Sequence, residues 1–223
     1  MKNKTFLTAA ILMMLPFTLQ AQWRVGLTAG IDYNIHSQDV HYMNDVKFSG
    51  RPGFYTGVSG QYSFNNWLGV RADLIFTQKN YNMRRTDLQE VNHSYMNNYL
   101  LLPVMASFSF GGNSFPLRGF ANIGAYGGAW LSSYRHGSEY NTMTGKQYEF
   151  AGPVAFNSEK DNRFDMGLTG GAGMEYRFNK HLSVQLEARC FHSLTSQVKQ
   201  YMRVKDYRYD TTIGLQAAVY YLF

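Results

Sequence analysis

Residues 212–223 of the chain read TIGLQAAVYYLF, and their side chains alternate between two kinds. One set is apolar and falls on every second position: Ile213, Leu215, Ala217, Val219, Tyr221 and Phe223. The positions between them carry Thr212, Gly214, Gln216, Ala218 and Tyr220. Because successive side chains of a strand point to opposite faces, this pattern predicts a β-strand with one apolar face. The fold depends on which solvent that face meets.

Seven further stretches alternate in the same way, with Ile75 as an apolar exception on a polar face. They cover residues 23–33, 53–64, 67–78, 99–110, 117–131, 164–178 and 182–191. The connections between them are long at 34–52, 79–97, 132–163 and 193–210, and short at Asn65-Asn66, 111–116 and Asn179-Lys180. In an up-and-down barrel this places all long loops at one rim and all tight turns at the other, beside both termini. We therefore expect an all-β, eight-stranded antiparallel up-and-down barrel.

The polar face decides between a soluble barrel and a membrane barrel. It carries many glycines, serines and glutamines, and its charged members are Arg24, Asp32, Arg71, Asp73, Arg118, Asp165, Glu175, Arg177, Glu187 and Arg189. The other face is nearly free of charge, and a Lys or Arg facing lipid at mid-bilayer would cost roughly 2–4 kcal/mol. A soluble lipocalin-like barrel is apolar inside. A soluble sandwich leaves the glycines unexplained, whereas small residues suit the crowded interior of eight strands. The sequence therefore predicts a transmembrane barrel of the outer membrane, with periplasmic termini.

Residues 1–21 have the pattern of a secretory signal peptide. Lys2 and Lys4 precede an apolar run from Phe6 to Leu19, and Ala21 is a small residue at the expected cleavage point. Residues 22–223 then form one barrel domain. Without Lys2 and Lys4, the chain has 19 basic and 15 acidic side chains, a mild net charge of +4 that suggests no nucleic-acid partner. Cys190 is the single cysteine, so no internal disulfide is expected.

Four of the predicted strands end in two aromatic residues on the apolar face. The pairs are Tyr62 and Phe64, Phe108 and Phe110, Tyr176 and Phe178, and Tyr221 and Phe223. Matched positions are typical of the aromatic girdle at a membrane interface, whereas ordinary strand propensity does not predict them. A strand ending in Phe223 also resembles the C-terminal signal that outer-membrane assembly machinery reads, so we expect that machinery as a partner during biogenesis.

The hairpin at residues 162–194, NRFDMGLTGGAGMEYRFNKHLSVQLEARCFHSL, resembles one in the small outer-membrane β-barrel family of Bacteroidetes, the PorT-like or porin-family proteins. The matching positions are Asp165, Gly167, Gly171, Gly173, Glu175, Tyr176, Leu182, Glu187 and Arg189, with Cys190 where the family usually has Tyr. Tyr99, Leu100 and Pro103 are similar to the family's Tyr-Leu-x-x-Pro strand, with a neutral Leu101 or Leu102 where an acid is common. The resemblance covers essentially the whole mature chain. It implies the fold and the outer-membrane location but little about activity, because most members have no assigned one.

Six polar-face residues are expected to form an interior ion-pair network: Arg71, Asp73, Glu175, Arg177, Glu187 and Arg189. Such a network either lines a selective pore or plugs the barrel. Eight strands leave no wide channel, which favours the plug. The sequence thus favours a non-enzymatic barrel with a structural or surface-interaction role and no cofactor. The alternatives are a narrow pore or a secretion-associated PorT-like barrel.

A lipid-modifying enzyme is the weaker alternative. His192, Ser193 and Ser196 lie near one strand end, but no acid completes a catalytic set at the same face and height. The other histidines, His36, His41, His93, His136 and His181, fall in predicted loops or turns without metal-ligand spacing. No catalytic, cofactor or metal residue is therefore predicted.

The predicted long loops are rich in cations, among them Lys79, Arg84, Arg85 and Lys146. The last loop carries Lys199, Arg203, Lys205 and Arg208, interleaved with tyrosines. These side chains either contact lipopolysaccharide phosphates and glycans above the outer leaflet or form an ordinary solvated surface. We expect a monomer surrounded by outer-membrane lipid, with any ligand held by the loops.

Overall fold

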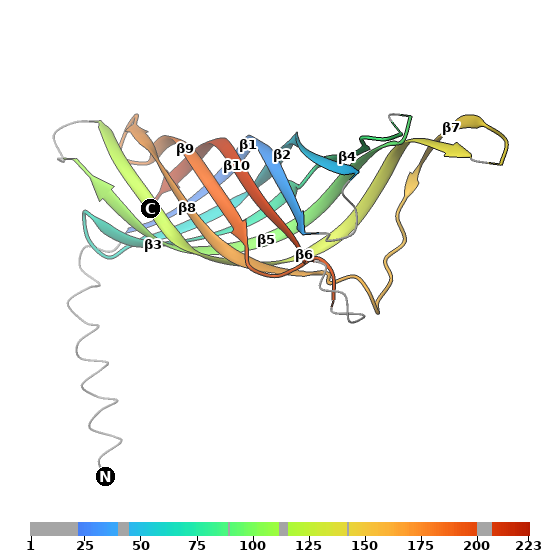
Figure 1. The fold of residues 1–223 in the computed structure, drawn as a ribbon. Coiled ribbons are helices and arrows are strands. Elements are labelled where there is room, and N and C mark those ends of the chain that lie inside the picture. Colours follow the sequence, from blue (N-terminus) through green and yellow to red (C-terminus); the bar gives the residue numbers. More distant parts are fainter. Residues whose placement is uncertain (1–21, 40–44, 89, 112–115, 142, 200–206) are drawn as a thin grey trace, which may run out of the picture.

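A computed structural model describes residues 22–39, 45–88, 90–111, 116–141, 143–199 and 207–223 (Figure 1). The predicted signal peptide, residues 1–21, lies outside the described residues. Among the described residues, no helix is long and apolar enough to cross a membrane. The chain forms one antiparallel sheet that closes on itself.

Ten strands follow one another along the chain. They are β1 (Gln22–Asp39), β2 (Val46–Ser63), β3 (Leu68–Gln78), β4 (Tyr81–Arg85), β5 (Asn92–Phe110), β6 (Leu117–Asn141), β7 (Lys146–Pro153), β8 (Phe164–Arg177), β9 (Leu182–Ser193) and β10 (Tyr207–Leu222). β4 pairs with both β2 and β5 and so continues β3, whereas β7 pairs only with β6 and lies outside the ring. The remaining ring has eight strands and closes where β1 pairs with β10. The predicted eight-stranded antiparallel barrel is confirmed.

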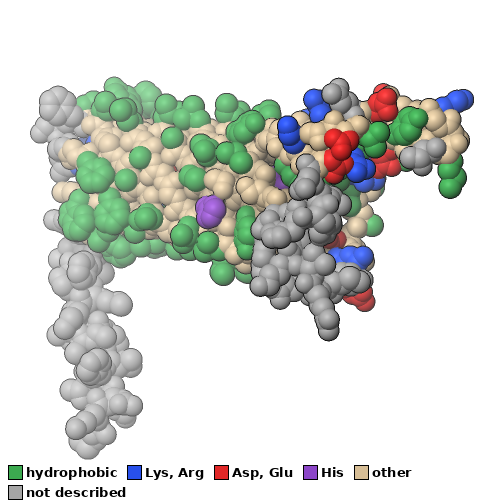
Figure 2. All heavy atoms as spheres, viewed as in Figure 1, with side chains coloured by type: hydrophobic (Ala, Val, Ile, Leu, Met, Phe, Trp, Pro, Cys, Tyr) green, Lys and Arg blue, Asp and Glu red, His purple; other side chains and the backbone are tan. Residues whose placement is uncertain are grey.

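Side chains alternate between the lumen and the outer surface along each barrel strand. On β1, Leu27 and Ile31 are 69% and 68% exposed, whereas Arg24 between the apolar positions is only 4% exposed. Figure 2 shows hydrophobic side chains over the barrel wall and charged side chains gathered at the end that carries β7. The apolar face therefore points outward, which is the arrangement of a membrane barrel and the reverse of a lipocalin.

Tight turns lie at the end of the barrel where the C-terminus is found (Figure 1). Asn65 Oδ1 accepts hydrogen bonds from the backbone N–H groups of Trp67 and Leu68, at 3.0 and 2.7 Å. Asn179 Oδ1 does the same for His181 and Leu182, at 2.8 Å each. An Asn side chain that bonds the backbone two residues on favours a turn, so both short connections are fixed locally.

At the opposite end the strands are longer than the sequence predicted. β1 continues to Asp39, and β2 begins at Val46. The expected loop 79–97 contains β4 and the start of β5, and the expected loop 132–163 contains the end of β6 and all of β7. The added segments of β1, β2, β4, β5 and β6 are called the strand extension below. Beyond the membrane both faces of a strand meet water, so the apolar-polar alternation fades and no longer marks a strand. A register shift between Asn98 and Tyr99 further interrupts the pattern.

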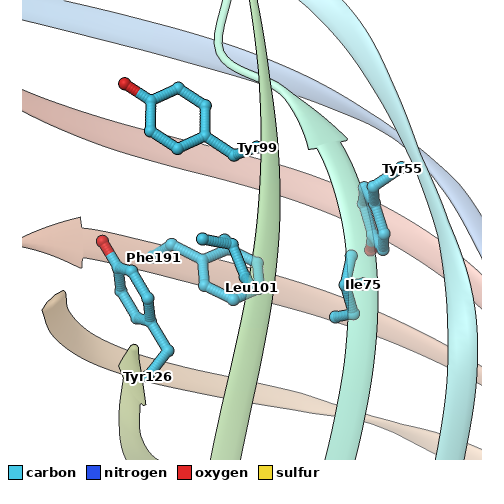
Figure 3. Close-up of a cluster of buried hydrophobic side chains, with 6 residues drawn as sticks. All are labelled: Tyr55, Ile75, Tyr99, Leu101, Tyr126 and Phe191. Atoms are coloured by element: carbon cyan, nitrogen blue, oxygen red, sulfur yellow. The ribbon is translucent and has the colours of Figure 1, made fainter. Parts of the chain in front are cut away.

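An apolar layer crosses the otherwise polar lumen. It consists of Tyr55, Ile75, Tyr99, Leu101, Tyr126 and Phe191, which come from β2, β3, β5, β6 and β9 (Figure 3). Ile75, the apolar exception on its strand, has no exposed surface. The layer divides the interior into two polar regions.

Candidate functional site: the sealed lumen

A ring of two arginines and two carboxylates lies in the lumen, between β3 and β9. Arg71 Nε donates to Asp73 at 2.8 Å and Arg71 Nη1 to Glu187 at 2.9 Å. Arg189 donates to Asp73 at 2.7 Å and to Glu187 at 2.8 Å. None of the four residues is more than 1% exposed. Each charge therefore contacts both opposite charges, and the ring is neutral as a whole.

Neutral polar groups donate to Glu187 beside this four-residue ring, whereas Arg71 Nη2 is buried without a hydrogen-bond partner among the described residues. Asn122 donates to Glu187 Oε1 at 2.9 Å, and Gln216 donates to Glu187 Oε2. A Cβ atom at Gly171 would lie 2.4 Å from Glu187 Oε1, so only glycine leaves room for this carboxylate. Additional hydrogen bonds of this kind offset part of the cost of burying an ion pair.

A second charged cluster lies between the four-residue ring and the tight-turn end. Arg24 Nη1 donates to Glu175 Oε2 at 2.6 Å, and Arg177 Nε donates to Glu175 Oε1 at 3.0 Å. Gln185 links the two clusters, since it donates to Glu175 and accepts from Arg71. The Arg177 side chain is 34% exposed, so this cluster opens toward the rim.

A third polar cluster lies beyond the apolar layer, toward the β7 end. Lys79 Nζ donates to Asp165 at 2.6 Å and to Ser193 at 3.2 Å, and it lies 5.0 Å from the centre of the Tyr99 ring. The assignment of Lys79 to a loop surface is therefore wrong, because its side chain is buried inside the barrel.

The same region contains a buried histidine that the sequence assigned to a loop. His36 Nδ1 lies 2.9 Å from Asp210 Oδ1, and Asn34 Nδ2 donates to the same oxygen at 3.1 Å. The His36 ring also stacks on Tyr81, with ring centres 4.1 Å apart. Continuing the alternation of residues 24–32 to positions 34 and 36 would have identified both side chains as inward-facing.

These layers fill the lumen with side chains. Arg71 and Ile75 have no accessible surface, and Leu101 and Tyr99 retain only 1% each. A side chain without accessible surface leaves no room for a water-filled path beside it. The barrel is therefore closed at the height of the four-residue ring and of the apolar layer.

The structure separates the residues considered for catalysis. His192 is exposed on the outer wall and pairs with Thr211 Oγ1 at 2.9 Å, whereas Ser193 is buried and contacts Tyr126 in the lumen at 2.9 Å. Ser196 Oγ accepts hydrogen bonds from the backbone N–H groups of Val198 and Arg208. His192 and Ser193 thus lie on opposite faces and cannot act on one substrate atom. Within the described part of the chain, no three His, Cys, Asp or Glu side chains are grouped to hold a metal ion.

The predicted aromatic pairs lie on strands next to the tight turns, where three of them form edge-on ring contacts. Tyr62 and Phe64, Tyr176 and Phe178, and Tyr221 and Phe223 have ring centres 5.2, 4.9 and 5.1 Å apart. In the fourth pair, the Phe108 ring stacks on Trp67 with ring centres 6.4 Å apart, and Phe110 is exposed. Two tryptophans that the sequence analysis did not include, Trp23 and Trp67, join the same aromatic set.

The predicted loop cations are only partly described. Arg203 and Lys205 lie outside the described residues. Lys199 is exposed, and its Nζ donates to the Ser158 carbonyl at 2.9 Å. Arg208 is half-buried at the start of β10. The structure therefore does not bring these four cations together into a described surface.

A family model for the outer membrane protein beta-barrel domain matches residues 18–198. The chain belongs to this family. That match fixes the outer membrane as the location of the barrel and lipid as the solvent of its apolar wall. None of the curated proteins compared with the chain matches it.

A solved structure of another outer-membrane protein, OprG, shares the fold of this family member, and two further structures are similar to it at lower scores. OprG from Pseudomonas aeruginosa is 13% identical with a TM-score of 0.56, and the alignment covers 92% of this chain and 96% of OprG. Neisserial surface protein A is also 13% identical, with a TM-score of 0.47 and coverage of 90% and 97%. The N-terminal barrel domain of Pseudomonas aeruginosa OprF is 13% identical, with a TM-score of 0.45 and coverage of 92% and 98%. At such low identity the likeness to OprG describes the fold alone.

Proposed function

We propose that this outer-membrane barrel is a closed, non-enzymatic protein that acts through its outer surface rather than by passing solutes. The observation that carries the proposal is the buried ring of Arg71, Asp73, Glu187 and Arg189, with the apolar layer next to it. Neither layer leaves a water-filled path, which argues against the narrow-pore alternative. The separation of His192 from Ser193 argues against a lipid-modifying enzyme built on these residues.

Planar-bilayer recording of the refolded protein tests this proposal. We expect no steady current from the wild type. Ile75→Gly with Leu101→Gly is a matched control that removes two side chains of the apolar layer but leaves the four-residue ring in place, so we expect it to stay closed as well. Steady open-channel current through the wild-type protein would refute the closed barrel.

The orientation and the partners follow as parts of the same proposal. Because the strand extension, β7 and the charged side chains visible on the surface in Figure 2 gather at one end, we infer that this end is extracellular and that the tight turns and termini are periplasmic. The exposed aromatic residues near the tight turns, such as Tyr176 and Phe178, then lie at the periplasmic interface as a girdle. Outer-membrane lipid surrounds a monomer, the assembly machinery inserts it, and Lys199 and Arg208, the described members of the predicted loop cations, contact lipopolysaccharide.

We also infer membership in the PorT-like barrels of Bacteroidetes from the hairpin motif. In the structure the motif residues Glu175, Glu187 and Arg189 are all engaged in buried ion pairs, and Gly171 makes room for one of them. The motif residues are therefore the ones that a sealed interior requires. A secretion-associated role would be supported by co-purification of secretion components after mild crosslinking in the envelope.

A further inference from the structure

Two exposed cations lie directly opposite each other on the strand extension. In the register of β2 and β4, Lys47 pairs with Arg84. Both side chains are exposed, and neither makes a hydrogen bond or ion pair within the described part of the chain. Like charges directly opposite on neighbouring strands destabilise a sheet. An anion between them would convert this repulsion into two favourable contacts.

The alternation of the strands shows which way the two cations face. Their neighbours Val46 and Arg85 are also opposite each other and face the barrel mouth, where Arg85 pairs with Asp45 at 2.5 Å. Lys47 and Arg84 therefore lie on the other side of the sheet, on the outside of the barrel.

The row of paired residues continues from these cations across three more strands. Arg84 is opposite Asn92, Asn92 is opposite Ser138, and Ser138 is opposite Glu149. On β5, Asn92 shares its face with Leu100 and Leu102, which are exposed on the apolar wall. The row of paired residues thus continues the lipid-facing surface toward the β7 end of the barrel.

An open groove of about 630 Å³ lies on this face of β5, β6 and β7. Among its lining side chains, Asn92, His136, Gln147 and Glu149 make no hydrogen bond within the residues that the structure describes. Amide, imidazole and carboxylate groups donate to and accept from hydroxyl groups, and Arg and Lys pair with phosphate. A polar groove beside two cations that have no partner among the described residues therefore matches a sugar chain that carries phosphate.

We propose that this groove, together with Lys47 and Arg84, binds the phosphorylated core oligosaccharide of lipopolysaccharide in the surrounding outer leaflet. The site faces sideways from the wall, in line with the exposed leucines below it, so a glycan anchored in the same leaflet stands directly beside it. The cations bind the phosphate, and the groove side chains bind the sugar hydroxyls. This inference rests on the proposed orientation and gives the surface-acting barrel a ligand class.

Binding of purified rough lipopolysaccharide to the refolded full chain in nanodiscs tests the site. We expect Lys47→Glu and Arg84→Glu each to weaken binding by about tenfold or more, since each change replaces an attraction by a repulsion. Lys180→Glu is the matched control, because Lys180 is an exposed cation at the tight-turn end. Lipopolysaccharide whose core phosphates have been removed should bind the wild type as weakly as the intact form binds Arg84→Glu.

The groove is tested separately from the cations. Gln147→Ala with Glu149→Ala should weaken binding of core-bearing lipopolysaccharide but leave binding of lipid A without core sugars unchanged. Wild-type affinity in Arg84→Glu, or an equal loss in Lys180→Glu, would overturn the site. Unchanged affinity of the groove variant would overturn the sugar assignment. Binding at this site with a conducting wild-type barrel would refute the closed lumen and leave this inference intact.

Discussion

Replacing Arg71 by Met tests whether water reaches the centre of the barrel. Arg71 donates to Asp73 and Glu187 and has no accessible surface. Met keeps much of the aliphatic stem but removes the charge, so Arg189 alone would have to neutralise two buried carboxylates. Breaking a buried pair in this way typically costs about 3–5 kcal/mol. With an m-value of about 2–3 kcal/mol/M, the urea midpoint should fall by about 1–2.5 M.

The assay is equilibrium unfolding in detergent or lipid vesicles, followed by tryptophan fluorescence and by heat-modifiable migration on a gel. The double variant Arg71→Met with Asp73→Asn restores neutrality and keeps the pair between Arg189 and Glu187. We expect it to lose less than the sum of the two single variants, because the residues share one network. Arg177→Met is the exposed control and should cost less than about 1 kcal/mol, since Arg177 is partly solvated and Arg24 remains on Glu175.

A small effect would contradict this reasoning. If Arg71→Met lost no more stability than Arg177→Met, water would be solvating the carboxylates that Arg71 had neutralised. The four-residue ring would then not seal the lumen. The same result would remove the main support for a closed barrel.

Three other outcomes follow from the structure. Gly124→Ala should prevent folding to the heat-modifiable form, because its Cβ would lie 2.0 Å from the Val104 carbonyl oxygen. Gly60→Ala is the control and should fold normally, because the atom nearest to its added Cβ would be 3.9 Å away. Lys79→Met should destabilise the barrel by about 3–5 kcal/mol in the same unfolding assay, because it leaves a carboxylate buried without its cation; a neutral result would mean that the third cluster is hydrated. Cys190 is exposed on the lipid-facing side of β9, so in proteoliposomes a small apolar maleimide should label it and a bulky hydrophilic maleimide should not.

The sequence predicted the ring of strands because lipid and lumen impose opposite requirements on successive residues. That requirement holds only inside the membrane. The predicted strand that begins at Tyr99 in fact begins at Asn92, and the expected loop 132–163 hides β7, since both faces there meet water. The sequence predicted charged side chains on the inner face, but it did not predict which of them form ion pairs with one another. Arg24 and Glu175 meet across 151 residues of sequence, and only the stagger of the closed sheet brings them to one height.

The apolar layer and Lys79 show a second limit of pattern analysis. Ile75 departs from the rule that inward residues are polar. Under that rule it is an unexplained exception rather than part of an apolar layer. Alternation itself carried the better signal. Arg71, Asp73, Ile75 and Thr77 are successive inward positions on β3, and one further step gives Lys79. Position along the alternation placed Ile75 on the inward face, and one further step would have placed Lys79 there too.

Because of the strand extension, a ligand can contact strand residues on the outer wall as well as loop residues at the rim. Loops at a barrel rim present side chains upward, toward the medium. Strands that continue above the membrane present every second side chain sideways, toward whatever stands in the leaflet. On β5, Leu100 contacts lipid and Asn92 lies on the same face higher up, so a molecule with an apolar anchor and a polar head can contact both. Under the proposed ligand assignment, a barrel with a sealed lumen and such a wall holds its neighbours in the membrane, and its specificity resides in strand residues that a search confined to loops would miss.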